Sequence, residues 1–183
     1  RELMSATIGQ TRYFDDRMVT LPGIATETSS TSDYIAQLRL SVFKNVNVAL
    51  GHQWDDDTTK SEARLQYRPA DNKILNLAYR YRAGSLEQGD LSWSWPLASQ
   101  WNFVGRYNYS LREQEVLEQF FGLEYESCCW GLRLVSRRHI STRDGTRDSS
   151  FGLQLVLKGM TSVGTAADKL LERGILGYSA DLR

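Results

Sequence analysis

Apolar and polar residues alternate through most of this chain, and this alternation constrains the fold more than any other feature. In residues 150–158, for example, every second residue is large and apolar, whereas the intervening Gln154 and Lys158 are polar. Successive side chains of a strand point to opposite faces, so each alternating segment has one apolar and one polar face. The pattern predicts an all-β fold of antiparallel strands that separates an apolar medium from a polar one.

The alternating segments number about ten, and each is about ten residues long. They are residues 3–14, 34–43, 46–54, 61–68, 73–82, 90–96, 101–111, 117–125, 129–138 and 150–158. Strands of soluble proteins usually have about five or six residues, whereas strands of about 9–11 residues cross a bilayer at a tilt. The lengths therefore favour a transmembrane β-barrel.

The connections between these segments alternate in length. Short connections at 44–45, 69–72, 97–100 and 126–128 are interleaved with longer ones at 15–33, 55–60, 83–89, 112–116 and 139–149. Aromatic residues also gather near both ends of the segments, as Trp101 and Tyr109 illustrate. Outer-membrane barrels combine short periplasmic turns, longer external loops and two aromatic girdles. A soluble β-sandwich, the alternative, explains the alternation but not these features together.

The composition argues against several other classes of protein. The chain of 183 residues carries 22 basic and 22 acidic residues, so no net charge attracts nucleic acid. Its mean hydropathy is −0.44, and no run of about 18 apolar residues could form a transmembrane helix. The chain begins at Arg1 without a signal peptide, and segment 3–14 is the weakest of the strands. We therefore expect a fragment of a larger barrel.

Motifs for catalysis or metal binding are scarce. The two histidines, His52 and His139, lack the spacing of a metal site, and the acidic run at 55–57 is typical of a hydrophilic loop. We expect neither an enzyme nor a bound metal or cofactor. The alternative function is that of a small stand-alone outer-membrane barrel acting as a porin, an adhesin or an enzyme.

Charged residues on the polar face are the candidates for the lining of a lumen. Charges of both signs suit a water-filled or plugged interior, although the solvated face of a sandwich would carry the same residues. The arginines that we expect to face the lumen are Arg80, Arg82, Arg106, Arg133 and Arg137.

The adjacent cysteines Cys128 and Cys129 lie at a short turn, on the rim that we assign to the periplasm. That compartment permits disulfides, but a bond between neighbouring cysteines is strained. A strained vicinal disulfide, a soft-metal site and two bridges to another domain are the possibilities. We favour two bridges to a domain outside this chain.

The pattern of strands ends near Lys158, so we divide the chain into a barrel portion, residues 1–158, and a periplasmic tail, residues 159–183. Residues 165–174 predict a short helix, because Leu170 and Leu171 give it an apolar side and Gly174 ends it. A tail of this kind suggests that something packs under the barrel.

Three segments resemble one known family. Residues 122–134 contain the Cys-Cys turn between two strands, residues 151–160 combine an apolar strand with Lys158-Gly159, and residues 91–97 have an alternating Trp-Ser-Trp-Pro motif. These segments are similar to the lipopolysaccharide-assembly outer-membrane protein family, LptD. The resemblance covers nearly the whole chain and is strongest over about residues 86–178.

The resemblance implies a function and a location. It implies that the chain forms about ten strands of a larger barrel of about 26 strands, in the outer membrane of a Gram-negative bacterium. The complete protein would insert lipopolysaccharide into the outer leaflet through the barrel lumen and a lateral gate. Its partners would be the plug lipoprotein LptE, periplasmic lipopolysaccharide-bridge proteins acting through a missing N-terminal jellyroll, the barrel-assembly machinery, membrane lipid and lipopolysaccharide itself, but no nucleic acid.

The resemblance also implies roles for particular residues. Cys128 and Cys129 match the cysteines that form inter-domain disulfides with the jellyroll. One lip of the lateral gate would be the last strand, namely Phe151, Gly152, Leu153, Gln154, Leu155, Val156, Leu157 and Lys158. We hypothesise that Gly152 weakens the pairing of this strand and so eases opening; the alternative is a glycine that serves packing in the girdle or a bend of the barrel.

Overall fold

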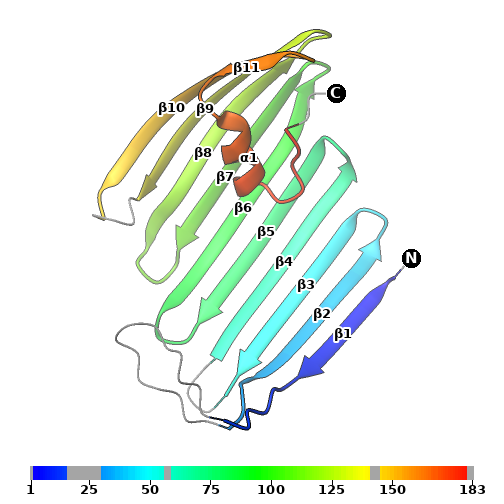
Figure 1. Ribbon diagram of the computed structural model, residues 1–183, viewed down its shortest axis with the longest axis vertical. Coiled ribbons are helices and arrows are strands. Elements are labelled where there is room, and N and C mark those ends of the chain that lie inside the picture. Colours follow the sequence, from blue (N-terminus) through cyan, green and yellow to red (C-terminus); the bar gives the residue numbers. More distant parts are fainter. Residues whose placement is uncertain (1, 16–29, 56–58, 141–144, 181–183) are drawn as a thin grey trace.

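The computed structural model describes residues 2–15, 30–55, 59–140 and 145–180. It consists of one 11-stranded antiparallel sheet in which every strand pairs with its neighbours in the sequence, together with one short helix (Figure 1). The strands are β1 (Met4–Gly9), β2 (Tyr34–Phe43), β3 (Val46–Trp54), β4 (Thr59–Ala70), β5 (Lys73–Arg82), β6 (Leu86–Ala98), β7 (Trp101–Ser110), β8 (Glu115–Glu126), β9 (Trp130–Ile140), β10 (Arg147–Leu157) and β11 (Thr161–Gly164), and the helix is α1 (Ala167–Gly174).

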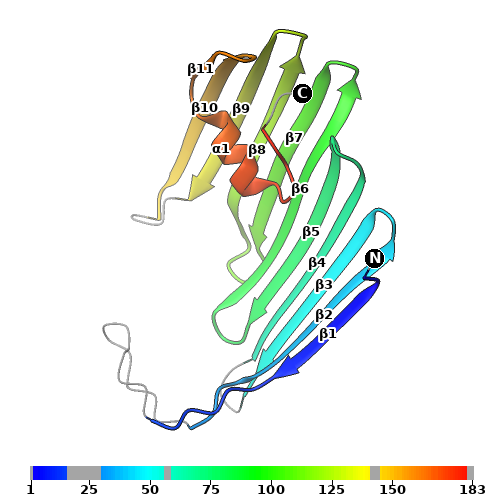
Figure 2. The same ribbon diagram turned by 45° about the vertical axis from the view of Figure 1, so that its right-hand side comes forward.

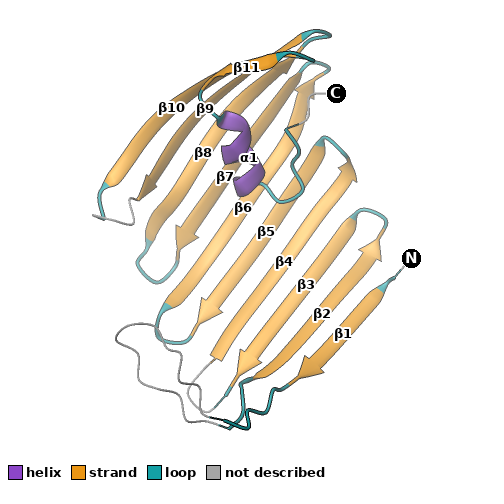
Figure 3. Ribbon diagram, in the orientation of Figure 1, coloured by secondary structure: helices purple, strands orange, loops and turns teal. Residues whose placement is uncertain are grey.

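The sheet is a single curved layer, and α1 lies against one of its faces (Figure 3). Turning the molecule keeps α1 in front of the strands from β6 to β10, and its contacts are with β7, β9 and β10 (Figure 2). There is no second sheet facing the first among the described residues, so the sandwich alternative is wrong. No helix within the described part of the chain is long and apolar enough to span a membrane.

The register of the sheet separates two chemically different faces. On β10, Phe151 is 64% exposed and Leu153 is 48% exposed, whereas Gln154 on the opposite face is 3% exposed. Because cross-strand partners share a face, this division extends through every strand pair. We call the face of Phe151 and Leu153 the outer face, and that of Gln154 the inner face. The alternation in the sequence is thus confirmed as a two-faced antiparallel sheet.

Aromatic side chains form clusters on the outer face near both rims. Near the short turns, the ring of Tyr125 lies 4.9 Å from that of Trp101 and 5.0 Å from that of Trp130, measured between centroids. At the opposite rim, the rings of Tyr34 and Trp54 stack at 5.7 Å. This arrangement matches two aromatic girdles that flank an apolar band.

Of segment 3–14, only Met4–Gly9 is a strand. The other predicted strands agree closely with the observed ones, apart from two differences. Segments 34–43, 46–54 and 73–82 are strands over those same residues. The longer loop expected at 83–89 is wrong, because Leu86 already pairs with Arg82 and only residues 83–85 connect β5 to β6. Gly84 makes this tight connection with a φ of 71°, a conformation that suits glycine.

The second difference lies beyond Lys158, where the sequence predicted no further strand. The chain turns at Gly159 and returns as β11, which pairs with β10 from Thr161 opposite Leu157 to Gly164 opposite Gln154. Residues 151–157 are therefore in the penultimate strand of the described sheet, and Lys158 lies in the turn. The helix predicted at 165–174 is confirmed as α1.

The buried apolar core lies between the inner face and the segment that follows β11. The sheet contributes Ile74, Val104, Phe120 and Val135, and the tail contributes Ala167, Leu171 and Ile175. Leu170 and Tyr178 pack against this cluster. The chain thus supplies the element that packs against its own inner face.

Candidate functional site on the inner face of the sheet

Residues 165–180 of the predicted tail pack on the inner face through one side of α1. From here on, the tail means these residues. Ala167, Leu171 and Ile175 are four residues apart, so they lie on a single side of the helix and its continuation. All three are buried, and Leu171 and Ile175 are fully so. A Cβ atom on Gly174 would lie 2.5 Å from the ring of Phe120. The absence of a side chain at Gly174 therefore permits the close approach of the helix to β8.

A buried ion pair fixes the end of the tail. Arg133 Nε donates to Glu124 Oε1 at 2.9 Å, and Arg133 Nη2 donates to the carbonyl oxygen of Ala180 at 2.6 Å. The hydroxyl of Tyr178 also donates to Glu124 Oε1. Burial, and next the carboxylate of Glu124, raise the pKa of Tyr178 far above its usual value. The phenol therefore stays protonated and remains a donor.

The start of the tail is held by β10. The amide of Thr165 donates to the carbonyl oxygen of Leu153 at 2.9 Å, and the Thr165 hydroxyl donates to the same atom at 3.1 Å. Gln154 Oε1 accepts from the amide of Asp168 at 3.1 Å, which satisfies a free N–H in the first turn of α1. A Cβ atom on Gly152 would lie 2.9 Å from Thr165 Oγ1. The strand and the tail are thus fitted to each other.

A third anchor lies on β4 and β5. The side-chain amides of Gln66 and Asn76 both donate to the carbonyl oxygen of Leu176, at 3.0 and 3.1 Å. Asn76 also donates to the hydroxyl of Ser92 at 3.2 Å. Together, the three anchors bind the tail across the inner face from β4 to β10.

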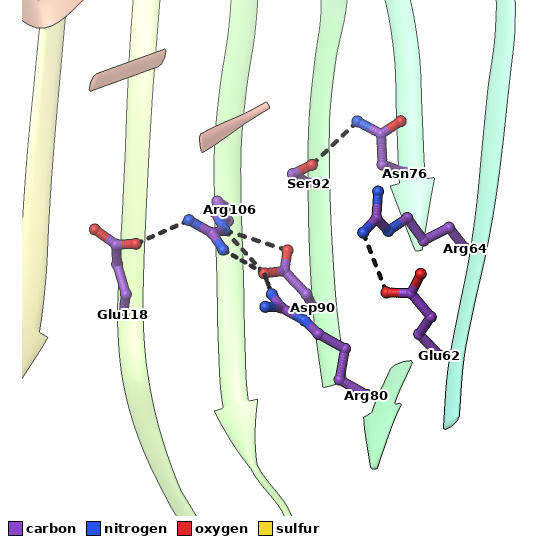
Figure 4. A network of polar contacts seen from close by, with 8 residues as sticks. All are labelled: Glu62, Arg64, Asn76, Arg80, Asp90, Ser92, Arg106 and Glu118. Atoms are coloured by element: carbon purple, nitrogen blue, oxygen red, sulfur yellow. Dashed lines mark hydrogen bonds and ion pairs between the residues drawn. The ribbon is translucent and has the colours of Figure 1, made fainter. Parts of the chain in front are cut away.

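Beside the tail, a chain of alternating charges runs across five strands, from β5 to β9. Arg106 on β7 donates from Nε to Asp90 Oδ2 at 3.0 Å and from Nη1 to Glu118 Oε2 at 3.0 Å (Figure 4). Arg80 approaches Asp90 Oδ2 at 3.8 Å from the other side, and Arg137 Nε donates to Glu118 Oε1 at 2.7 Å. On this part of the inner face each charge neutralises another, which lowers the cost of partial burial.

A groove lies on the inner face beside the tail. Its volume is 610 Å³, and it extends from the flank of α1 over the inner faces of β1 to β7. Within it, Arg64 pairs with Glu62 at 3.2 Å, and both side chains are about half exposed. Arg39 and Arg173 also line the groove, and neither makes an ion pair with another described residue. The groove is open, and its lining carries five arginines against three acidic residues, Glu2, Asp90 and Glu172.

The five arginines proposed from the sequence as lining a lumen all lie on the inner face, as their cross-strand partners show. Arg80, Arg106 and Arg137 belong to the alternating chain of charges, whereas Arg133 anchors the tail. Arg82 lies at the end of β5 and makes no ion pair among the described residues.

The two cysteines lie in the turn between β8 and β9, and both are exposed and free. Their Sγ atoms are 2.8 Å apart. The hydrogen bond between the thiols lowers the pKa of Cys128 and raises that of Cys129. A thiolate is the reactive form of cysteine, and both thiols are accessible at this turn. Among the described residues, no group of three or more side chains could ligate a metal ion.

Several residues of this site could not be singled out from the sequence. The sequence assigned Gln154 to the gate strand and Gly174 to the end of the helix, but it did not predict that these residues and Tyr178 hold the tail, because their contacts join segments that are far apart in the chain. The spacing of Leu171 and Ile175 was the one available signal for tail docking. The pairing of Glu124 with Arg133 would follow from the register of the β8–β9 hairpin, in which the two residues are opposite each other.

An antiparallel meander with an apolar outer face, aromatic clusters at both rims and an ion-paired inner face defines a wall segment of an outer-membrane type of β-barrel. Comparison with known proteins gives the family. The family model LptD, described as LPS transport system D, matches residues 1–112. The chain belongs to the LptD family.

The relatives extend the similarity to almost the entire chain. It is 39% identical over 180 residues to the LPS-assembly protein LptD of Nitrosococcus oceani, with 97% of this chain and 24% of that protein covered. The LptD proteins of Xylella fastidiosa and Xanthomonas campestris pv. campestris are 35% and 34% identical, with 99% of this chain and 24% of each relative covered. The chain thus spans about a quarter of the length of these relatives, so the stand-alone barrel is not favoured.

Proposed function

We propose that this chain forms part of the wall of an outer-membrane translocon that inserts lipopolysaccharide into the outer leaflet. The observation that carries the proposal is the division of the sheet into two faces, in a chain of this family. Lipopolysaccharide has a polar saccharide and apolar acyl chains, and the two faces match these two chemistries. The role is transport, and the proposal involves no catalytic step.

A route for the acyl chains requires an opening in the wall. A free strand edge exposes backbone hydrogen-bonding groups, which is costly in lipid, so an opening needs a weakly paired strand. The four-residue β11 is such a strand and follows β10 at the end of the described sheet. We propose that the lateral gate, assigned from the sequence to residues 151–158, is bordered by β10 together with β11.

We further propose the partners that the family resemblance suggests. These are a plug lipoprotein inside the barrel, bridge proteins in the periplasm, the barrel-assembly machinery during folding, and lipid on the outer face. The exposed thiols of Cys128 and Cys129 support disulfides with a periplasmic domain. Non-reducing gels of the full-length protein should show lost bridging in Cys128→Ser and Cys129→Ser. Unchanged oxidised mobility in both would contradict this assignment.

Adjacent serines on opposite faces offer a direct test of the transport route. Ser150 lies on the inner face of β10, and Ser149 lies on the outer face, and both are exposed. A photoreactive residue at each position of the full-length protein in its membrane would report the local ligand. We expect the inner position to crosslink lipopolysaccharide only while lipopolysaccharide is being supplied from the periplasm. The outer position should crosslink membrane lipid whether or not supply continues.

The outcome that rejects the transport route is equally specific. If no position on the inner face crosslinks lipopolysaccharide during supply, the saccharide does not pass along this wall. Equal, supply-independent crosslinking at Ser149 and Ser150 would mean that the two faces are not separated in the assembled barrel.

A further inference from the structure

The inner wall has two halves that differ in charge. On β7 to β10 the cations Arg106, Arg133 and Arg137 are each paired with an acidic residue of the sheet. On β2 to β6, cations outnumber anions. The inner-facing cations there are Arg39, Lys60, Arg64, Arg68, Arg80 and Arg82, and the inner-facing anions are Glu62 and Asp90. The inner face of β2 to β6 is therefore basic.

The groove concentrates this charge beside the docked tail. Arg39, Arg64, Arg80 and Arg106 line its sheet side together with Glu2 and Asp90, and Arg173 lines its helix side together with Glu172. The cations of the lining thus outnumber its anions by five to three. Arg173 belongs to the tail, so docking of α1 places one more guanidinium opposite those of the strands. Arg39 and Arg173 have no acidic partner in the described ranges, and their donors are free to bind a ligand.

The kind of occupant follows from what the groove lacks. The inner-facing residues of β3 and β4 are polar or small, namely Asn47, Ala49, Gly51, Gln53, Lys60, Glu62, Arg64 and Gln66. The apolar part of the inner face is already covered by the tail. A stable protein partner needs an apolar, desolvated contact at the centre of its interface, and the inner-facing side chains of β3 and β4 offer none. An anionic, hydrated ligand is therefore favoured over a polypeptide.

We propose that this groove binds the phosphate or carboxylate groups of a saccharide headgroup, that of the glycolipid carried through the barrel. The inference rests on the proposed transport function and adds the site. Guanidinium groups present paired donors that match phosphate and carboxylate oxygens. Lys60 and Arg82 extend the basic surface toward the rim with the longer loops, in a second groove that adjoins the first. Exposed charges bind weakly, which suits a ligand that must move on.

The test uses the full-length protein with its natural partners and a photoreactive residue at Asn47, which lines the groove. We expect Asn47 to crosslink lipopolysaccharide during supply, and a phosphorylated headgroup saccharide to compete. The same saccharide without phosphate should compete poorly. Replacing Arg39 and Arg173 by Gln should weaken competition by about two- to fivefold for each guanidinium, and less at high salt.

Arg147→Gln is the matched control, because Arg147 lies on the outer-facing side of β10 and is 65% exposed. It should leave competition unchanged. All variants are compared after heat-modifiable gel mobility shows that the barrel is folded, and Arg39→Lys should restore part of the binding lost in Arg39→Gln.

The results separate the groove from the general transport route. Crosslinking at Ser150 but not at Asn47 would overturn the groove while leaving the transport route standing. A crosslink from Asn47 to a polypeptide, or equal competition by the two saccharides, would also overturn it. Absence of crosslinks at both positions would overturn the transport route and the groove together.

Discussion

Truncation of Leu171 should release the tail from the inner face. Leu171 is fully buried in the cluster between α1 and the sheet. Leu→Ala substitutions at buried positions cost about 2–5 kcal/mol, because they lose apolar contact and leave a cavity. Since the tail can open without unfolding the strands, this cost falls on the local docking equilibrium. The undocked fraction should rise by about 30-fold to several thousandfold.

Limited proteolysis of the full-length protein measures this fraction. Lys169 and Arg173 provide trypsin sites within α1, and the cleavage rate follows the open population when opening and closing are fast. The control is Leu176→Ala, because Leu176 is a leucine of the same tail that is 55% exposed. Its cleavage rate should change by less than about threefold. Similar rates for wild type and Leu171→Ala, or equal increases in both variants, would refute the docking described above.

Three further perturbations test the other anchors of the tail. Gly152→Val should weaken docking of the tail by about 1–3 kcal/mol, because the new Cβ atom would crowd Thr165. If the rate of tail proteolysis does not change, Gly152 is not needed for this contact, and only its hypothesised effect on strand pairing remains. Arg133→Met should cost about 3–5 kcal/mol of docking, since Glu124 would remain buried without its partner, and additional Glu124→Gln should recover part of this loss in the same assay. The raised pKa of Tyr178 predicts a pH dependence: the docked tail favours the protonated phenol, so docking should be constant below about pH 10 and weaken as the pH rises further. Spin-label distances between tail and sheet, recorded from about pH 8 to about pH 11, should show this release, and a distance distribution that stays constant over that range would contradict it.

The fold could be predicted from the sequence because local periodicity determines it. In β5 and β10 the alternation specifies both the strand and the face of every side chain, whatever the rest of the chain does. The missed strand shows the limit of this reasoning. Thr161–Gly164 has no apolar alternation, and it forms a strand because the turn at Gly159 returns it alongside β10.

The candidate site was harder to predict, for a related reason. The sequence placed Arg106 and Arg133 on one polar face but could not distinguish their roles. Arg106 balances acidic neighbours within the sheet, whereas Arg133 reaches Ala180, which is 47 residues away along the chain. That contact depends on how the tail crosses the sheet, and the periodicity of the sequence does not indicate where the tail lies.

The tail also explains why the inner wall is divided. An isolated inner face with Ile74, Val104 and Phe120 exposed would carry an apolar patch in a hydrated lumen, and such a patch favours adhesion to passing apolar groups. By covering these residues with Leu171 and Ile175, the chain leaves polar side chains to face the remaining space. It follows that undocking should have two effects together, exposure of the patch and removal of Arg173 from the groove. Leu171→Ala should therefore slow transport more than Arg173→Gln does, and a smaller effect of Leu171→Ala would show that the patch is covered by another element.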